Sequence, residues 1–160
     1  MTWHTRPAGL ALAALLLAGC GGAPADPTSS LVVAWSQGEH RDLVGGDPSV
    51  GARRTTLIQT TADRARFVAG LPASIPTQER DVVSAVDLAT HVIVVGVYAN
   101  CAARSHITRE DEVVRFVVDR DLDTRCAWAP IEVEVWSVAR DGMPEQILLR
   151  DERGDLAAEG

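Results

Sequence analysis

The hydrophobic pattern is clearest in the second half of the chain. Residues 92–98 are apolar at successive positions, which is typical of a central strand covered on both faces. Residues 112–119 and 131–139 are rich in β-branched and aromatic side chains, and both ranges predict strands. Within 131–139, apolar positions alternate with Glu132 and Glu134, so this range predicts one buried face and one solvent-exposed face.

The first half of the chain predicts shorter elements. Residues 31–36 and 56–60 have the composition of strands. A short helix is expected over 61–69, with Thr61 as its cap, and a second over 77–86.

The N-terminus has the layout of a secretion signal. Residues 1–9 carry positive charge and no acid, and the apolar run 10–17 is too short to span a membrane, which takes about 20 residues. The run ends in Leu17-Ala18-Gly19-Cys20, which resembles the bacterial lipobox. In that family the cysteine thiol takes a diacylglyceryl group, and cleavage follows before it. The resemblance implies a lipid anchor on Cys20 at the extracytoplasmic face of the cell membrane; an ordinary signal peptide with an accidental cysteine is the alternative.

This signal sets the predicted domain boundaries. We expect a lipoprotein signal peptide over 1–19, the lipidated cysteine and a flexible tether over 20–30, and one β-rich domain over 31–150. Residues 151–160 are expected to form a polar C-terminal tail.

Two further cysteines constrain the topology. In an oxidising compartment, Cys101 and Cys126 are expected to form a disulfide. Their Cα atoms must then come within about 7 Å, and this is possible only if residues 103–110 form another strand that reverses the chain.

The side chains support this hairpin. A tight turn at 111–112 places Ile107 opposite Phe116 on an apolar face, and Arg104 opposite Asp119 on a polar face. The predicted fold class is therefore α+β and mainly β: an antiparallel sheet or small sandwich with one or two short helices and one disulfide.

Charge narrows the set of partners. The formal net charge is −7, and an acidic domain repels nucleic acid, so no nucleic-acid partner is expected. The expected partners are the membrane, reached through the lipid anchor, and an envelope protein.

The sequence predicts no catalytic residue, no metal site and no cofactor. None of the four histidines stands in metal-ligand spacing with another histidine or a cysteine. No serine lies in a nucleophile-elbow pattern. His40 and His106 are the residues that an enzyme would use, and solvated surface is the simpler interpretation of both.

Trp128, Arg104 and His106 are the candidate binding residues. Tryptophan is frequent at interfaces, although packing in the core or against the disulfide is the favoured interpretation of Trp128. Arg104, His106 and Arg115 form a basic strip that would suit an acidic partner, with cross-strand ion pairing to Asp119 as the simpler alternative.

From about residue 56 to residue 140, the order of elements resembles the C-terminal domain of the bacterial protease-complex subunit PrcB. That order is a strand, a helix, an apolar strand after Val86-Asp-Leu88, a hairpin over 105–118, then Pro130 and a last strand. Where that family has a Thr-Gly-Gly-Tyr-like turn, this chain reads Asn100-Cys-Ala-Ala-Arg104. The resemblance implies a non-enzymatic β module with a binding role.

Together these features predict a lipid-anchored envelope protein that acts as a non-catalytic binding or scaffolding module. Its partner is expected to contact the loops near the cysteine pair and Trp128, or the turn-rich loop 38–54. The alternatives are an envelope hydrolase that uses His40 or His106 and a carrier of a small ligand.

Overall fold

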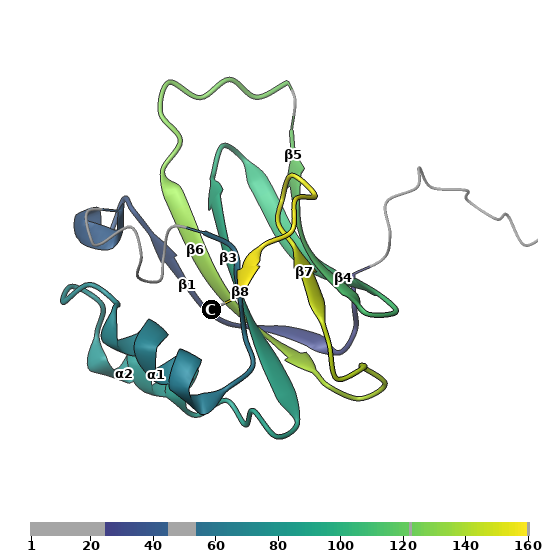
Figure 1. Cartoon of the computed structure of the whole chain (residues 1–160). Helices are drawn as coiled ribbons and strands as arrows, with labels where there is room; N and C mark the ends of the chain where they lie inside the picture. Colours follow the sequence, from purple (N-terminus) through teal and green to yellow (C-terminus); the bar gives the residue numbers. More distant parts are fainter. Residues whose placement is uncertain (1–24, 45–53, 122, 160) are drawn as a thin grey trace, which may run out of the picture.

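The computed structural model describes residues 25–44, 54–121 and 123–159, and their strands form two sheets (Figure 1). Sheet A has the strand order β1-β6-β3-β2-β8, and sheet B has the order β4-β5-β7. Neighbouring strands are antiparallel except in the pairs β2–β8 and β5–β7. The elements are β1 (Ser29–Ser36), the 3-10 helix η1 (Arg41–Val44), β2 (Thr56–Ile58), α1 (Thr61–Ala69), α2 (Thr77–Ser84), β3 (His91–Ala99), β4 (Ala103–Glu110), β5 (Val113–Arg120), β6 (Ile131–Ala139), β7 (Leu148–Arg150) and β8 (Ala158–Glu159). The mainly-β fold class predicted from the sequence is confirmed.

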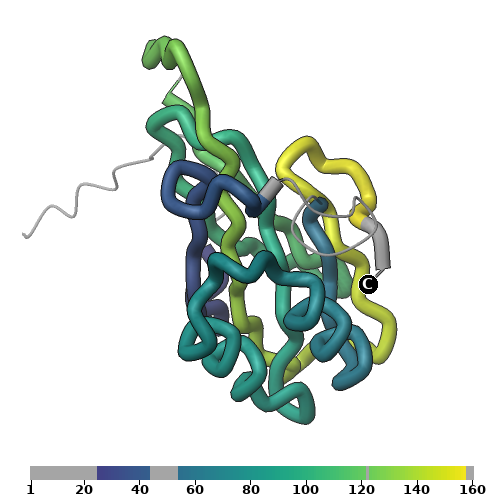
Figure 2. The backbone as a smooth tube through the Cα atoms, turned by 90° about the vertical axis from the view of Figure 1, so that its left-hand side faces the viewer, coloured from purple at the N-terminus to yellow at the C-terminus, as the bar shows by residue number. Residues whose placement is uncertain are grey.

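Sheet A is the middle layer of the molecule. The two short helices lie across one of its faces, as Figure 2 shows, and sheet B covers the other. Strand β3 contributes side chains to both cores. Ile93 and Val95 lie in the core under the helices, and Val92 and Val94 lie in the core between the sheets. All four side chains are fully buried, so the prediction of a central strand covered on both faces is confirmed.

The helices follow the predicted pattern with small shifts at their ends. Thr60, rather than Thr61, caps α1, and its hydroxyl oxygen accepts a hydrogen bond from the Asp63 N–H at 3.2 Å. Two consecutive threonines make either position chemically suitable, and Thr60 has the extended backbone, with φ −117° and ψ 155°, that is typical of an N-cap residue. Helix α2 ends at Ser84, two residues earlier than predicted.

The β4–β5 hairpin has the predicted register. Ile107 pairs with Phe116 and Arg104 pairs with Asp119, and the turn between the strands places Asp111 at a φ of 50°. The hairpin returns the chain so that a disulfide joins Cys101 to Cys126, with their Cα atoms 5.9 Å apart.

The prediction of a solvent-exposed face on β6 is wrong. Sheet B covers that face, and Glu134 is only 8% exposed. The Glu134 carboxylate accepts hydrogen bonds from the Tyr98 hydroxyl at 2.9 Å, from the Trp136 indole N–H at 2.9 Å and from the Ser105 hydroxyl. Because Tyr98 lies on β3 and Ser105 on β4, this carboxylate links the two sheets. Alternation identified the polar face but carried no information on what covers it.

The fold reaches beyond 31–150 at both ends. Strand β1 begins at Ser29, and Asp26 is buried, so part of the predicted tether belongs to the domain. In the predicted tail, β8 pairs with β2. Both segments are polar in composition and join the fold largely through backbone hydrogen bonds, which a hydrophobic pattern does not register.

Gly96 provides a first test of the contact between the sheets. A Cβ at this position would lie 2.2 Å from ring carbons of Phe116. We expect Gly96→Ala to lower the free energy of unfolding by about 1–3 kcal/mol, because the ring must move within a packed core. Urea unfolding followed by tryptophan fluorescence measures this. In a Phe116→Leu background the same change should cost less; an equal cost in both backgrounds would contradict the steric explanation.

Tyr98 provides a second test. Burial and the charge of Glu134 raise the pKa of Tyr98 well above its usual value of about 10. The phenol is therefore expected to stay neutral through about pH 10, and its contribution to stability should be lost at higher pH, where the unfolded chain ionises. Because the chain has a single tyrosine, alkaline titration of tyrosinate absorbance reports this group alone. Ionisation near pH 10 without loss of the folded fluorescence signal would refute the buried contact.

Candidate functional site

Trp128 stands out as an exposed aromatic residue at one end of the sandwich. It lies in the β5–β6 connection, the arch at the top of Figures 1 and 2, which the Cys101–Cys126 disulfide ties to the β3–β4 turn. The side chain is 64% exposed, in contrast to Trp35 at 1%. A core role for Trp128 is therefore excluded, and its ring is available to another molecule.

The loop after β1 comes to the same place. Trp128, Gln37, Gly38 and Arg41 line one hollow, and we call this set the Trp128 surface. Gln37 is held there because its N–H donates to the Ile131 carbonyl at 2.8 Å, and its side-chain oxygen accepts from the Ile131 N–H at 3.2 Å. The sequence offered the loop 38–54 and the Trp128 region as separate candidates. The structure brings the start of that loop to Trp128, while residues 45–53 lie outside the described residues.

Two carboxylates near this end are held in their ionised form. A hydrogen bond from the Ser74 hydroxyl lowers the pKa of Asp42, which follows Arg41 in η1. In the β5–β6 connection, the Thr124 hydroxyl at 2.6 Å and the Asp123 N–H at 3.0 Å lower the pKa of Asp121. The loops around the Trp128 surface thus present fixed charges and an aromatic ring.

Arg104 and His106 lie elsewhere, on the outer face of sheet B. His106 Nδ1 is 3.2 Å from a carboxylate oxygen of Asp119, so Asp119 pairs with His106 and not with Arg104, its backbone neighbour. Neither residue lines the hollow beside Trp128. A second, polar hollow on this face is lined in part by His106, Thr108, Arg115, Asp119, Glu152 and Arg153.

The two histidines that an enzyme would use lie at separate places, His106 on β4 and His40 in the turn after β1. No serine or cysteine lines the hollow around His106. The His40 N–H closes a turn onto the Ser36 carbonyl at 2.9 Å. Across the described ranges, no three His, Cys, Asp or Glu side chains are grouped closely enough to hold a metal ion. In the same part of the chain, no helix is long and apolar enough to cross a membrane.

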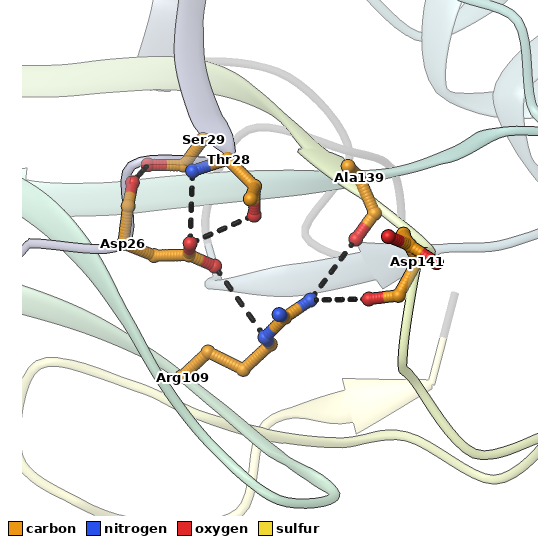
Figure 3. A network of polar contacts seen from close by, with 6 residues as sticks. All are labelled: Asp26, Thr28, Ser29, Arg109, Ala139 and Asp141. Atoms are coloured by element: carbon orange, nitrogen blue, oxygen red, sulfur yellow. Dashed lines mark hydrogen bonds and ion pairs between the residues drawn. The ribbon is translucent and has the colours of Figure 1, made fainter.

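Sequence reasoning missed a polar network where the chain enters the domain (Figure 3). Asp26 is 8% exposed, and its N–H donates to the Ile107 carbonyl on β4 at 2.7 Å. One carboxylate oxygen of Asp26 accepts from the Thr28 N–H at 2.9 Å and from the Thr28 hydroxyl at 2.7 Å. The Asp-Pro-Thr sequence signals such a local turn, but it does not reveal the tertiary contacts.

Arg109 completes this network from the end of β4. Its Nε lies 3.7 Å from the second carboxylate oxygen of Asp26. Its Nη1 donates to the carbonyls of Asp141 at 3.0 Å and Ala139 at 3.3 Å (Figure 3). The buried carboxylate is thereby paired with a cation that is itself bound to the end of β6. We call the Asp26–Arg109 pair the entry clasp.

No protein-family model, curated protein sequence or solved structure matches this chain. The function of the Trp128 surface and of the entry clasp therefore has to follow from their own geometry and chemistry.

Proposed function

We propose that this protein is a lipid-anchored component of the bacterial cell envelope that acts as a non-catalytic binding module. Cys20 carries the anchor, and the Trp128 surface receives the partner, which is another envelope protein. The observation that carries the binding role is the exposed ring of Trp128 beside Gln37 and Arg41.

The energetics of this surface support binding. An aromatic side chain of this size buries about 150–250 Å² on association. At about 25 cal/mol per Å², covering the exposed part of Trp128 contributes about 3 kcal/mol. Tryptophan and arginine are also the residues most often found at interface hot spots. The disulfide and the Gln37–Ile131 hydrogen bonds hold the surrounding loops, so little conformational freedom is lost on binding.

One feature of the sequence and one of the structure support the anchor. Leu17-Ala18-Gly19-Cys20 has the lipobox pattern directly after a short apolar run. The Cys101–Cys126 disulfide is also the kind of bond that persists in an oxidising envelope compartment. Cys20 and the signal segment lie outside the described residues.

The outer face of sheet B provides a location for one alternative, the carriage of a small ligand. Its hollow combines Arg115 and Arg153 with Asp119 and Glu152, which favours a small ligand carrying both charges. Intact-mass measurement of a retained ligand separates this alternative from a protein-binding module. The hydrolase alternative has weaker support, because no serine or cysteine lines the hollow beside the His106–Asp119 pair.

The anchor is tested by Cys20→Ala. Without the thiol no lipid can be attached, so we expect the protein to leave the membrane fraction and to lose incorporation of a labelled fatty acid. Two acyl chains hold firmly where one is marginal, so the change in partitioning should be nearly complete. A Cys101→Ala/Cys126→Ala variant is the control and should stay lipidated. Unchanged incorporation of the labelled fatty acid by Cys20→Ala would rule out this anchor.

The binding role is tested by Trp128→Ala, with Leu156→Ala as a matched control because Leu156 is 62% exposed and does not line the Trp128 surface. In intact cells, cross-linking should capture a reproducible partner with the parent chain and the control. Loss of a hot-spot side chain is expected to weaken binding by about 30-fold, which corresponds to about 2 kcal/mol. Equal capture by both variants would remove Trp128 from the site. Identification of a protease as the partner would support the resemblance to the PrcB domain.

A further inference from the structure

We propose that the end of the sandwich carrying the entry clasp faces the membrane, and that the short tether from Cys20 to Asp26 keeps the Trp128 surface turned away from the lipid. This inference rests on the proposed anchor at Cys20. It assigns a lipid-facing surface to one end of the domain and places the protein partner on the far side of it.

The clasp and the Trp128 surface lie at opposite ends of the same strands. Strand β1 starts beside the clasp, where Ser29 pairs with Val138, and ends where Ser36 pairs with Glu132. The clasp holds the end of β6 through Ala139, whereas Gln37 of the Trp128 surface binds Ile131 at its start. Figure 1 shows the same separation, with the chain entering near the lower part of β4 and the β5–β6 connection at the top.

The length of the tether limits how the domain can turn. Asp26 follows Cys20 by six residues, which reach at most about 21 Å at about 3.5 Å per residue. Strand β6 has nine residues, and at about 3.4 Å per residue it spans about 27 Å. If the domain were inverted, so that the Trp128 surface faced the lipid, Asp26 would lie at least one strand length above the membrane. The tether is too short to reach that far.

Several contacts set this reach. Beside the Asp26–Arg109 pair, the Asp26 N–H donates to the Ile107 carbonyl at 2.7 Å, and the Thr28 carbonyl accepts from the Ala139 N–H at 3.2 Å. The free chain therefore ends at Asp26, and its reach stays shorter than strand β6.

The clasp end of the domain is acidic. The loops around the clasp carry exposed carboxylates at Asp87, Glu110, Asp111, Glu112, Asp141 and Glu145. Anionic headgroups repel these groups. This end is therefore kept near the membrane by covalent attachment and not by adhesion to lipid.

The orientation can be measured by energy transfer, because the chain contains no lysine. A single introduced lysine then provides a unique side-chain amine for a dye. Gln146→Lys labels the clasp end just before β7, and Ala127→Lys labels the far end beside Trp128. The chain from Cys20 onward is coupled through the Cys20 thiol to a maleimide phospholipid in phosphatidylcholine vesicles that contain a rhodamine-labelled lipid. The parent chain, labelled at its amino terminus alone, gives the background to subtract.

We expect severalfold more energy transfer from the label at 146 than from the label at 127. Equal transfer would show that the domain lies on its side, and the reverse order would show that it inverts; either result overturns the proposal. A Gly-Ser insertion between Gly21 and Gly22 lengthens the tether and leaves the folded domain unchanged, so it should reduce the difference. An unchanged difference with the longer tether would overturn the role of tether length.

This measurement separates the inference from the proposed function. Chemical coupling reports the orientation whether or not cells lipidate the chain. The intact mass of the protein purified from membranes tests lipidation of Cys20 independently, and absence of the diacylglyceryl group would refute the anchor alone.

Discussion

Sheet A must be buried on both of its faces. Strand β3 places Ile93 and Val95 under the helices and Val92 and Val94 under sheet B, so neither cover can be removed without exposing a core. Both covers are built from short elements that could not bury enough apolar area alone. The helices and the β4–β5 hairpin are therefore stable because they pack on this sheet. Gly96 matters for the same reason, since it leaves the space that the Phe116 ring fills.

The Glu134 carboxylate fixes how sheet B lies on sheet A. A buried carboxylate without partners costs several kcal/mol, and here its hydrogen bonds come from β3, β4 and β6. A shift of sheet B along sheet A would break the Ser105 contact and leave the charge poorly satisfied. The apolar side chains supply most of the stabilisation of this interface, and the polar contacts select one alignment.

This alignment gives the two ends of the sandwich different roles. The disulfide and the Gln37–Ile131 hydrogen bonds hold loops around an exposed tryptophan at one end. At the other end the Asp26–Arg109 pair and the hydrogen bond from the Asp26 N–H to the Ile107 carbonyl hold the segment through which the chain arrives from Cys20. A binding surface carried by rigid strands, with its attachment point at the opposite end, suits a module that reaches a partner away from the lipid.

Features that depend on spacing along the chain could be predicted from the sequence. The period of two and the tight turn paired Ile107 with Phe116 in the hairpin, and the expected disulfide between Cys101 and Cys126 required the strand 103–110. Three features could be identified only from the tertiary structure: the burial of Glu134, the entry clasp, and the position of Gln37 beside Trp128. Each joins residues far apart in sequence through single hydrogen bonds, ion pairs or side-chain contacts. Such contacts leave no periodic pattern in the sequence. The residues that form them can therefore be identified only from the packed structure.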